Sequence, residues 1–199
     1  MRIGITGGIG AGKSLVCTIF KILGVHCYNA DSRAKALMNS DANLKQKIVD
    51  LFGPQSYKNG VLNTTYISDQ VFFNPDSLEK LNSFVHPAVS RDFDHWETNQ
   101  PNEVYVLKEA ALLFETGSYS DLDKTILIVA PESLRIQRVK ERDPERGEQQ
   151  IKAIIDKQLK DEEKLKLADY IIFNNESELL TPQVLAVHDK ILLNKKAPD

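Results

Sequence analysis

A glycine-rich stretch close to the N-terminus carries the clearest chemical signal of this chain. Residues 7–14 read Gly-Gly-Ile-Gly-Ala-Gly-Lys-Ser, which matches the phosphate-binding pattern of a glycine, four spacers, Gly12, Lys13 and Ser14. Glycines let the backbone turn its N–H groups toward phosphate oxygens without clashes of Cβ atoms. The lysine ammonium can contact the β- and γ-phosphates, and the serine hydroxyl can bind Mg²⁺. We therefore expect this chain to bind a nucleoside triphosphate.

The segments around this loop predict the context that the pattern requires. The apolar run 2–6 suits a buried strand, and residues 15–23 predict a buried helix that ends at Gly24. A strand, a glycine-rich loop and a helix place the positive N-terminal end of the helix next to the phosphates. The expected nucleotide-binding residues of this segment are Gly8, Gly10, Ala11, Gly12, Lys13, Ser14 and Leu15.

Asp31 is the best candidate for contact with a phosphate acceptor. It follows the predicted strand 25–29 at its carboxyl end, where doubly wound sheets place ligand chemistry. Transfer of a γ-phosphoryl group needs an in-line oxygen nucleophile, and a carboxylate there could position or deprotonate a hydroxyl. The alternative is that Asp31 caps the helix that begins near Ser32. The two roles are compatible.

Arg135, Arg138 and Arg142 recur at helical spacings of three and four, so they are predicted to share one face. Guanidinium groups on a closing helix could neutralise charge on a transferring phosphoryl group. The alternative is a solvated basic stripe paired with neighbouring glutamates. The glycine-rich loop favours the first role for Arg138 and Arg142, and leaves Arg135 and Arg146 open.

Three further polar residues have a functional and a structural interpretation. Glu109 follows a predicted buried strand at 104–107 and could hold the water shell of Mg²⁺, or be a plain strand-end carboxylate. Thr6 could contact the acceptor or a phosphate, or only end the first strand. His86 precedes a proline, where a structural hydrogen bond is the favoured role and acceptor contact the second.

Composition limits the class of protein. The chain has 199 residues and two cysteines. Its net charge is −3, so no overall positive charge indicates binding to nucleic acid. Cys17 and Cys27 show no metal-ligand spacing and are interpreted as small buried hydrophobes, and no His/Cys/carboxylate cluster predicts a structural metal. The loop begins close to Met1, which leaves no room for a signal peptide, and no apolar run is long enough for a membrane span. We expect a cytoplasmic protein with small-molecule partners.

The order of elements predicts an α/β fold with a parallel sheet covered by helices. Runs 104–107 and 125–129 are apolar on both faces, as buried parallel strands are, and residues 168–174 are predicted to form the last strand. Residues 31–99 are mostly helical, with turn signals at 53–54 and 59–60, Asp76 as a predicted cap, and Pro87 kinking or restarting a helix. The expected domains are a nucleotide-binding core (1–29, 100–132 and 167–199), a helical acceptor-binding insertion (30–99) and a lid (133–166), an organisation that resembles small P-loop kinases.

Several segments in this order resemble the dephospho-coenzyme A kinase family. The matching segments are 4–14, 29–31, 86–87, 112–115, 137–143, Gln158 and 168–174. The resemblance implies ATP-dependent phosphorylation, with Mg²⁺, of the ribose 3′-hydroxyl of dephospho-coenzyme A. We expect a monomer or a small homo-oligomer. Two positions depart from the family pattern: Ala111 stands where many members have proline, and Ile154 stands where an arginine is usual.

The resemblance also implies roles for individual residues. Asp31 becomes the base or orienter of the ribose hydroxyl. Arg138 and Arg142 act from the lid, and Asn174 lies near the adenine of ATP. Lys13 and Ser14 handle phosphate and magnesium, as their motif also predicts.

Two other functions stay open at this point. The first is a nucleoside, nucleotide or other small-metabolite kinase. Nucleotide kinases need basic groups for a second phosphate chain, and the acceptor segment contains Arg33, Lys35, Lys45, Lys47 and Arg91. The second is a regulatory NTPase. The guanine-reading pattern Asn-Lys-x-Asp fails at its last position in residues 194–197, and the long helical insertion favours a kinase.

Overall fold

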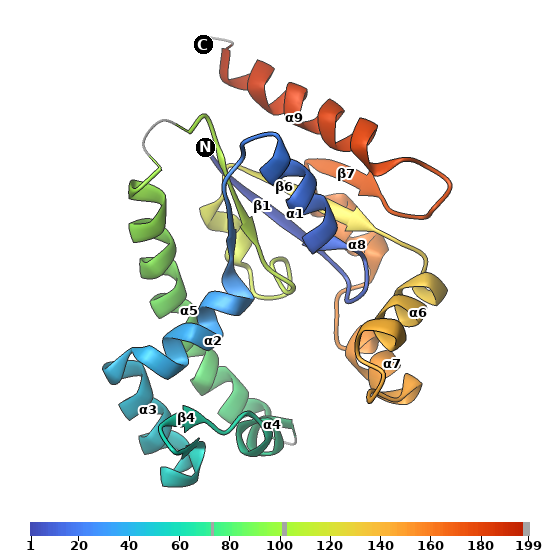
Figure 1. Cartoon of the computed structure of the whole chain (residues 1–199). Coiled ribbons are helices and arrows are strands. Elements are labelled where there is room, and N and C mark those ends of the chain that lie inside the picture. The colour runs from blue at the N-terminus through green and yellow to red at the C-terminus, as the bar shows by residue number, and fades with distance from the viewer. Residues whose placement is uncertain (73, 101–102, 197–199) are drawn as a thin grey trace. The chain divides into compact units, whose positions relative to one another are not determined.

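The computed structural model of this chain describes residues 1–72, 74–100 and 103–196, and it divides into two compact units (Figure 1). The first unit consists of Met1–Asn29 and Gln100–Asp199, and the second of Ala30–Asn99. The second unit is therefore an insertion into the first, made where one strand ends.

The first unit is built on a parallel sheet in the order β2-β5-β1-β6-β7. Its strands are β1 (Arg2–Gly7), β2 (Cys27–Asn29), β5 (Val106–Glu109), β6 (Lys124–Val129) and β7 (Tyr170–Phe173). This order confirms the predicted α/β fold with a parallel sheet. The strand expected at 104–107 lies two residues later, because Ile5 of β1 pairs in register with Glu109, which is thus the last strand residue.

Both faces of this sheet are covered. α1 (Lys13–Ile22) and α9 (Leu180–Lys196) run side by side over one face (Figure 1), and their apolar side chains join those of the strands in a core that includes Phe20 and Ile126. The opposite face carries the segment 110–122, which includes η2 (Ser118–Asp121). A Cβ at Gly4 would lie 2.5 Å and 2.6 Å from side-chain atoms of Leu113 and Leu122, so glycine is what admits this segment to the sheet.

Along the chain, three helices follow β6 and precede β7. They are α6 (Glu132–Arg142), α7 (Glu148–Asp156) and α8 (Asp161–Leu167). α6 packs against α7, and α8 contacts β6. The charged stretch seen in the sequence is thus largely helical, and it belongs to the first unit.

Asp169 ties the chain before β7 to β6. Its carboxylate accepts hydrogen bonds from the backbone N–H and the hydroxyl of Thr125, at 2.8 Å and 3.0 Å, and from Lys124 Nζ at 2.8 Å. Burial alone raises the pKa of this carboxyl, but the three donors outweigh burial and hold its pKa below the ordinary value of 3.8. Asp169 is therefore ionised, and in this form it fixes the start of β7 against β6.

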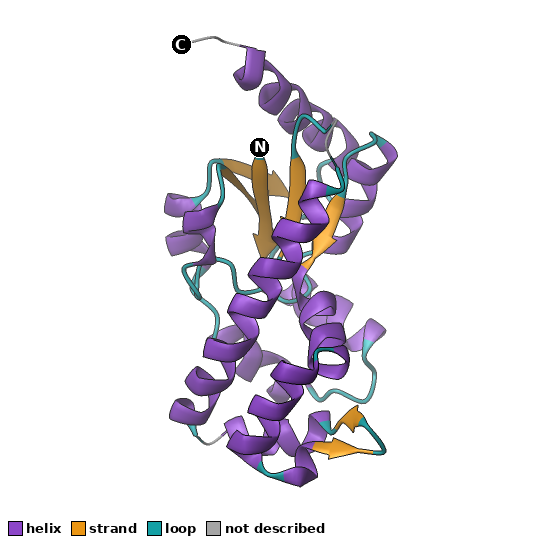
Figure 2. Cartoon of the chain, turned by 90° about the vertical axis from the view of Figure 1, so that its left-hand side faces the viewer, coloured by secondary structure: helices purple, strands orange, loops and turns teal. Residues whose placement is uncertain are grey.

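The second unit is mainly helical (Figure 2). Its elements are α2 (Ala30–Ser40), α3 (Ala42–Phe52), η1 (Pro54–Ser56), β3 (Tyr57–Lys58), β4 (Val61–Leu62), α4 (Thr64–Phe72) and α5 (Pro75–Thr98). β3 and β4 form an antiparallel hairpin at the predicted turn, where Asn59 and Gly60 have φ angles of +52° and +79°. Two consecutive positive φ angles match the twist of a two-residue hairpin.

The long helix α5 differs from the prediction in two ways. Its cap is Asn74, whose side chain accepts a hydrogen bond from Ser77 N at 3.1 Å, rather than Asp76. Pro75 suits the first helical position, which moves the cap to the residue before it. The helix also continues through Pro87 instead of restarting, because Val85 and Val89 on either side are buried and hold both halves in place.

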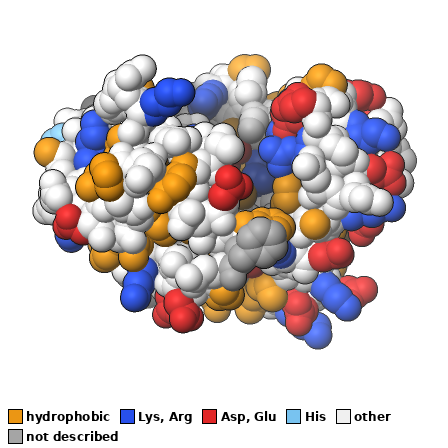
Figure 3. Space-filling model, turned by 90° about the horizontal axis from the view of Figure 1, so that it is seen from below, with side chains coloured by type: hydrophobic (Ala, Val, Ile, Leu, Met, Phe, Trp, Pro, Cys, Tyr) orange, Lys and Arg blue, Asp and Glu red, His pale blue; other side chains and the backbone are white. Residues whose placement is uncertain are grey.

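Acidic and basic side chains are interspersed on the face drawn in Figure 3, in keeping with the small net charge of −3. Within the described ranges, no helix is both long enough and apolar enough to span a bilayer.

Candidate functional site

The glycine-rich loop joins β1 to α1 in the predicted arrangement of strand, loop and helix, although the helix begins at Lys13, two residues earlier than predicted. Gly10 and Gly12 have φ angles of +76° and +96°, which residues with a Cβ rarely adopt. The ammonium of Lys13 donates to the carbonyl of Gly7 at 2.9 Å and so lies over the loop. A positive charge and the N-terminal end of a helix therefore meet at the same place.

Helix α6 lies directly against this loop through Arg135. A Cβ on Gly10 would lie 2.9 Å from the Cα of Arg135, and a Cβ on Gly8 would lie 3.1 Å from its guanidinium carbon. The Arg135 side chain is 8% exposed and reaches Asp161 at 3.7 Å. In the described part of the chain its Nε has no hydrogen-bond partner. A buried guanidinium with an unused donor beside a phosphate-type loop can receive an anion. The sequence left this residue undecided.

Asn174, directly after β7, joins the loop to a second arginine of α6. Its side-chain amide donates to the carbonyl of Ala11 at 2.8 Å, and its Oδ1 accepts from Arg138 Nη2 at 3.3 Å. Arg138 also bonds the backbone carbonyl of Asn174 at 3.2 Å and the carboxylate of Glu176 at 3.3 Å. Gly12 has no room for a side chain because the Asn174 amide occupies that space. Arg138 and Asn174 thus lie together at the edge of the loop.

Gln158 connects the loop to the segment 112–115. Its Oε1 accepts from Ile9 N at 3.0 Å, and the next residue, Leu159, donates its N–H to Glu115 at 3.1 Å. Glu115 also pairs at 3.0 Å with Lys164, whose side chain is fully buried. Buried charges persist when they are paired. Gln158 and Glu115, which both belong to the matching segments found in the sequence, therefore together hold the chain after α7 against the loop.

Glu109 lies beside Ser14 and is buried. Ser14 Oγ donates to Glu109 Oε1 at 3.1 Å, and Asn29 Nδ2 donates to Glu109 Oε2 at 2.7 Å. A hydroxyl and a carboxylate are hard oxygen donors of the kind that Mg²⁺ prefers, so these residues fit that ion. No role was predicted for Asn29 from the sequence. Its signals were its place at the end of a predicted strand and its position in the matching segment 29–31.

Thr6 is fully buried at the end of β1, and in the described ranges its hydroxyl has no hydrogen-bond partner. A buried hydroxyl of this kind keeps a donor and an acceptor to offer.

A hollow of about 530 Å³ in the first unit is lined by Arg135, Gln158, Phe173 and Asn175 among others. Arg135 and Gln158 both contact the glycine-rich loop, so the hollow lies beside it. It combines an aromatic face with polar groups at its rim. Hollows of this composition suit a planar ring with polar edges.

The remaining arginines of α6 do not join this cluster. Arg142 ends the helix, about 10 Å along its axis from Arg135 by helix geometry. Its guanidinium makes two hydrogen bonds to Asp143, which raise its pKa, and its side chain is 63% exposed. Arg146 lies 3.9 Å from the same carboxylate. The predicted single face of arginines is thus divided, because Arg135 is covered while Arg142 turns to its neighbour.

Two predicted acceptor contacts belong to the second unit. Asp31 lies in the first turn of α2, and His86 lies within α5, with both side chains exposed.

The two departures from the family pattern lie in the first unit. Ile154 is half-buried in α7, and Ala111 lies in the turn that follows β5.

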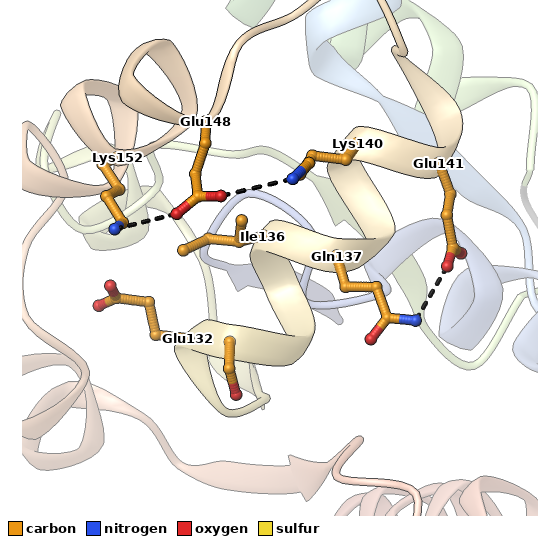
Figure 4. A pocket seen from close by; sticks show the side chains of 8 residues that line it. Glu132, Ile136, Gln137, Lys140, Glu141, Glu148 and Lys152 are labelled. Carbon is orange, nitrogen blue, oxygen red and sulfur yellow. Dashed lines mark hydrogen bonds and ion pairs between the residues drawn. The ribbon is translucent and has the colours of Figure 1, made fainter.

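A larger hollow, of about 690 Å³, lies on the outer side of α6 and α7 (Figure 4). Three of its charged groups already pair with one another: Glu148 lies between Lys140 and Lys152, at 3.4 Å and 3.1 Å. None of its lining residues is a member of the glycine-rich loop. Size alone therefore does not make it the nucleotide site.

One of the two cysteines differs from the prediction that both are small buried hydrophobes. Cys17 is buried in α1, but Cys27 in β2 is only partly buried, and the two thiols are hydrogen-bonded to each other. That bond lowers the pKa of Cys27 and raises the pKa of Cys17. Together with a carboxylate oxygen of Glu109 they form a group of possible metal ligands, which the sequence did not indicate. The spacing of the two cysteines gave no metal-like pattern, and only the packing of α1 on the sheet brings Glu109 near both.

The family model and the curated relatives point to one family. The sequence model of the family described as dephospho-CoA kinase matches residues 1–179. The dephospho-CoA kinase of Bacteroides fragilis is 33% identical over 185 residues, which are 93% of this chain and 90% of that protein. A dephospho-CoA kinase structure from Campylobacter jejuni has a TM-score of 0.70 at 28% identity and covers 97% of this chain and 98% of its own. A crystal structure from Thermus thermophilus has a TM-score of 0.83 at 30% identity, with coverage of 100% and 98%.

Proposed function

This chain belongs to the dephospho-CoA kinase family, and we propose that it transfers the γ-phosphoryl group of ATP to the ribose 3′-hydroxyl of dephospho-coenzyme A. In this reaction the 3′-oxygen forms a bond to the γ-phosphorus, and the bond from that phosphorus to the β–γ bridging oxygen breaks. ADP leaves, and the hydroxyl proton passes to a base. The observation that carries the proposal is the glycine-rich loop with Lys13, Ser14 and Glu109 around it, in a chain that matches the family over most of its length.

The loop is the proposed cradle for the triphosphate. The positive φ angles of Gly10 and Gly12 allow backbone N–H groups of the loop to face phosphate oxygens, while the N–H groups of Ile9 and Ala11 donate to Gln158 and to the Gly8 carbonyl. Lys13 would exchange its contact with the Gly7 carbonyl for the β- and γ-phosphates. Little covalent chemistry is asked of the protein, since positioning and charge stabilisation supply most of the catalysis.

Ser14 and Glu109 are the proposed residues for Mg²⁺, with Ser14 as a direct ligand and Glu109 acting through bound water. Mg²⁺ would neutralise charge on the β- and γ-phosphates. Asn29 donates to the second oxygen of Glu109 at 2.7 Å and so holds the carboxylate in one orientation. Such supporting hydrogen bonds fix the geometry of a metal site.

Two arginines of α6 are proposed to contact the phosphate chain. Arg138 was expected from the sequence, and its hydrogen bonds to Asn174 support a position at the edge of the loop. Arg135 is the addition from the structure, supported by its burial against the loop and its unused Nε. Arg142 would need to release Asp143 to act from a closing lid formed by residues 133–166.

The purine of ATP is proposed to occupy the hollow beside the loop. Phe173 offers a stacking face there, and Asn175 offers an amide for the ring edge. Asn174 remains the predicted neighbour of the adenine, since it lies between Phe173 and Asn175 in the chain and contacts the loop. Its own amide is already bonded to Ala11 and Arg138.

The second unit is the proposed acceptor domain. Asp31 would orient the 3′-hydroxyl and take its proton, because it is the carboxylate that follows β2, the strand whose last residue is Asn29. Thr6 and His86 are proposed as further acceptor contacts. Because MgATP is the donor, we propose that the protein acts in the cytoplasm. We also propose that it is a monomer or a small homo-oligomer.

One assay tests the activity. Purified protein with MgATP is offered dephospho-coenzyme A, a set of nucleoside monophosphates, or no acceptor, and release of ADP is followed. We expect ADP only with dephospho-coenzyme A. Turnover only with monophosphates would move the protein to the nucleotide kinases, and equal turnover without acceptor would make it an NTPase.

Replacement of Asp31 tests the proposed base. Asp31→Asn removes a proton acceptor but keeps the shape of the side chain, so kcat should fall by about 10²–10⁴-fold. The affinity for ATP, measured by titration calorimetry, should stay within about twofold because the loop is untouched. Asp69→Asn, in α4 of the same unit, makes the same change of charge at an exposed site and should leave both values unchanged. A normal rate for Asp31→Asn would leave Asp31 only a structural role; that role is not the predicted cap, because α2 already begins at Ala30 and Asp31 lies in its first turn.

A further inference from the structure

Cys17, Cys27 and Glu109 form a group in which only Glu109 has a role in the proposed reaction. One ligand atom from each residue lies within 4.8 Å of the other two. The residues come from α1, β2 and the end of β5, so three separate elements converge at this point. Cys17 and Glu109 are buried, and Cys27 is partly exposed. An ion could therefore reach the group from the side of Cys27.

The spacing suits a tetrahedral cation. With metal–sulfur bonds of about 2.3 Å and metal–oxygen bonds of about 2.1 Å, ligand atoms in a tetrahedron are about 3.5–3.8 Å apart. Atoms within 4.8 Å of one another need only small side-chain movements to reach that geometry. Three protein ligands leave the fourth position for water, as in other open zinc sites.

We propose that Cys17, Cys27 and Glu109 form a binding site for a thiophilic divalent cation, of which Zn²⁺ is the type. Two sulfur ligands select Zn²⁺ over Mg²⁺, because hard cations bind thiolates poorly. Both thiols release their protons when the metal binds, so two protons are displaced for each ion.

Occupation of this site would affect the proposed kinase through Glu109. The carboxylate accepts from Ser14 at 3.1 Å and from Asn29 at 2.7 Å. A bound Zn²⁺ competes for one of these oxygens and draws the carboxylate toward the thiols. The site therefore inhibits phosphoryl transfer when it is filled, and this consequence alone rests on the proposed function.

The binding is tested with the metal alone. Reduced, full-length protein without nucleotide is titrated with Co²⁺, which reports sulfur ligation through thiolate-to-metal charge-transfer absorption and tetrahedral geometry through intense d–d bands. We expect one equivalent with both signatures, and Zn²⁺ should displace the Co²⁺. Absence of the charge-transfer band, with both thiols shown to be reduced by a thiol titration, would overturn the proposal.

Variants locate the site. Cys17→Ala and Cys27→Ala should each abolish the charge-transfer band or weaken Zn²⁺ binding by more than about tenfold, measured against a chromophoric chelator. His26→Gln is the matched control: this imidazole adjoins Cys27 but pairs with Glu103 at 3.3 Å. It should bind as the parent protein does. Because Cys17 is buried, thermal unfolding of the metal-free variants checks folding, and Cys27→Ala tests the site at its more exposed ligand. Binding of one equivalent by both alanine variants would overturn the proposal.

The inhibitory consequence has a separate readout. The phosphorylation rate at saturating MgATP should fall as Zn²⁺ fills the site and recover on addition of a chelator. In Cys27→Ala, which lacks a ligand, the rate should be insensitive to the same concentration of Zn²⁺. If Co²⁺ binds as expected but no acceptor is phosphorylated, the proposed function fails and the metal site stands. Equal inhibition of the parent and Cys27→Ala would refute the coupling.

Discussion

Replacement of Gly10 by alanine tests the packing of α6 against the glycine-rich loop. Gly10 has a φ angle of +76°, and a Cβ at this position would lie 2.9 Å from both the Cα and the carbonyl carbon of Arg135. These are backbone atoms of a helix, so they cannot rotate away as a side chain can. Either the loop or the helix must move.

The magnitude follows from comparison with Gly117→Ala. Gly117 has a similar φ of +70°, but no heavy atom beyond its chain neighbours lies within 4 Å of the place that a Cβ would take there. Both alanines meet the strain of a left-handed conformation, about 1–2 kcal/mol. Only Gly10→Ala adds overpacking, about 1–3 kcal/mol. We therefore expect Gly10→Ala to lower the free energy of unfolding by about 1–3 kcal/mol more than Gly117→Ala does.

Urea unfolding and ATP titration measure the two consequences. Gly10→Ala should also weaken ATP binding by more than about tenfold, since a shift of about 1.4 kcal/mol at the loop suffices for that. Gly117→Ala should bind ATP as the parent does. If the two variants lose equal stability and bind ATP equally, α6 does not pack on the loop as described, and the proposed role of Arg135 fails with it.

Three further predictions concern the supports of the site. Glu115→Gln leaves Lys164 buried without a countercharge and should cost about 3–5 kcal/mol in urea unfolding, whereas Glu115→Gln with Lys164→Met should recover part of that loss; additive effects would contradict the pair. The native pKa of Asp169 lies below 3.8, so its carboxylate stabilises the fold above that pH, and the advantage of the parent over Asp169→Asn should disappear as pH falls through the lower native pKa. A constant advantage down to acid pH would refute this. Asn29→Ala frees one oxygen of Glu109 and should raise the Mg²⁺ concentration for half-maximal rate about tenfold, with an unchanged Mg²⁺ profile arguing against a role in holding the metal.

Local patterns were sufficient for most elements of this fold. The strand 2–6, the glycine-rich loop and the apolar run 125–129 each signal their conformation through neighbours a few residues away, and the structure places all three as predicted. Boundaries were less reliable. The strand predicted at 104–107 is shifted because pairing with β1, rather than its own composition, sets where it ends.

Side chains that act together from distant segments could not be predicted in the same way. The spacing of Arg135, Arg138 and Arg142 predicted a shared face, but contact with the loop buries the first while Asp143 holds the last. Nothing in the local sequence of Gln158 indicates that it binds the backbone of Ile9. Such contacts depend on the path by which the chain comes back to the glycine-rich loop after α7. The spacing of residues along the sequence does not encode that path.

The sequence by itself determined that this protein binds a nucleoside triphosphate, because a phosphate cradle is a local structure built from consecutive glycines, a lysine and a serine. Only the tertiary structure decided what surrounds the cradle. The strand order β2-β5-β1 brings Asn29, Glu109 and Ser14 into one hydrogen-bonded group and sets two cysteines beside it. That order results from how apolar faces bury one another across the whole first unit, so it becomes visible only after the chain has folded.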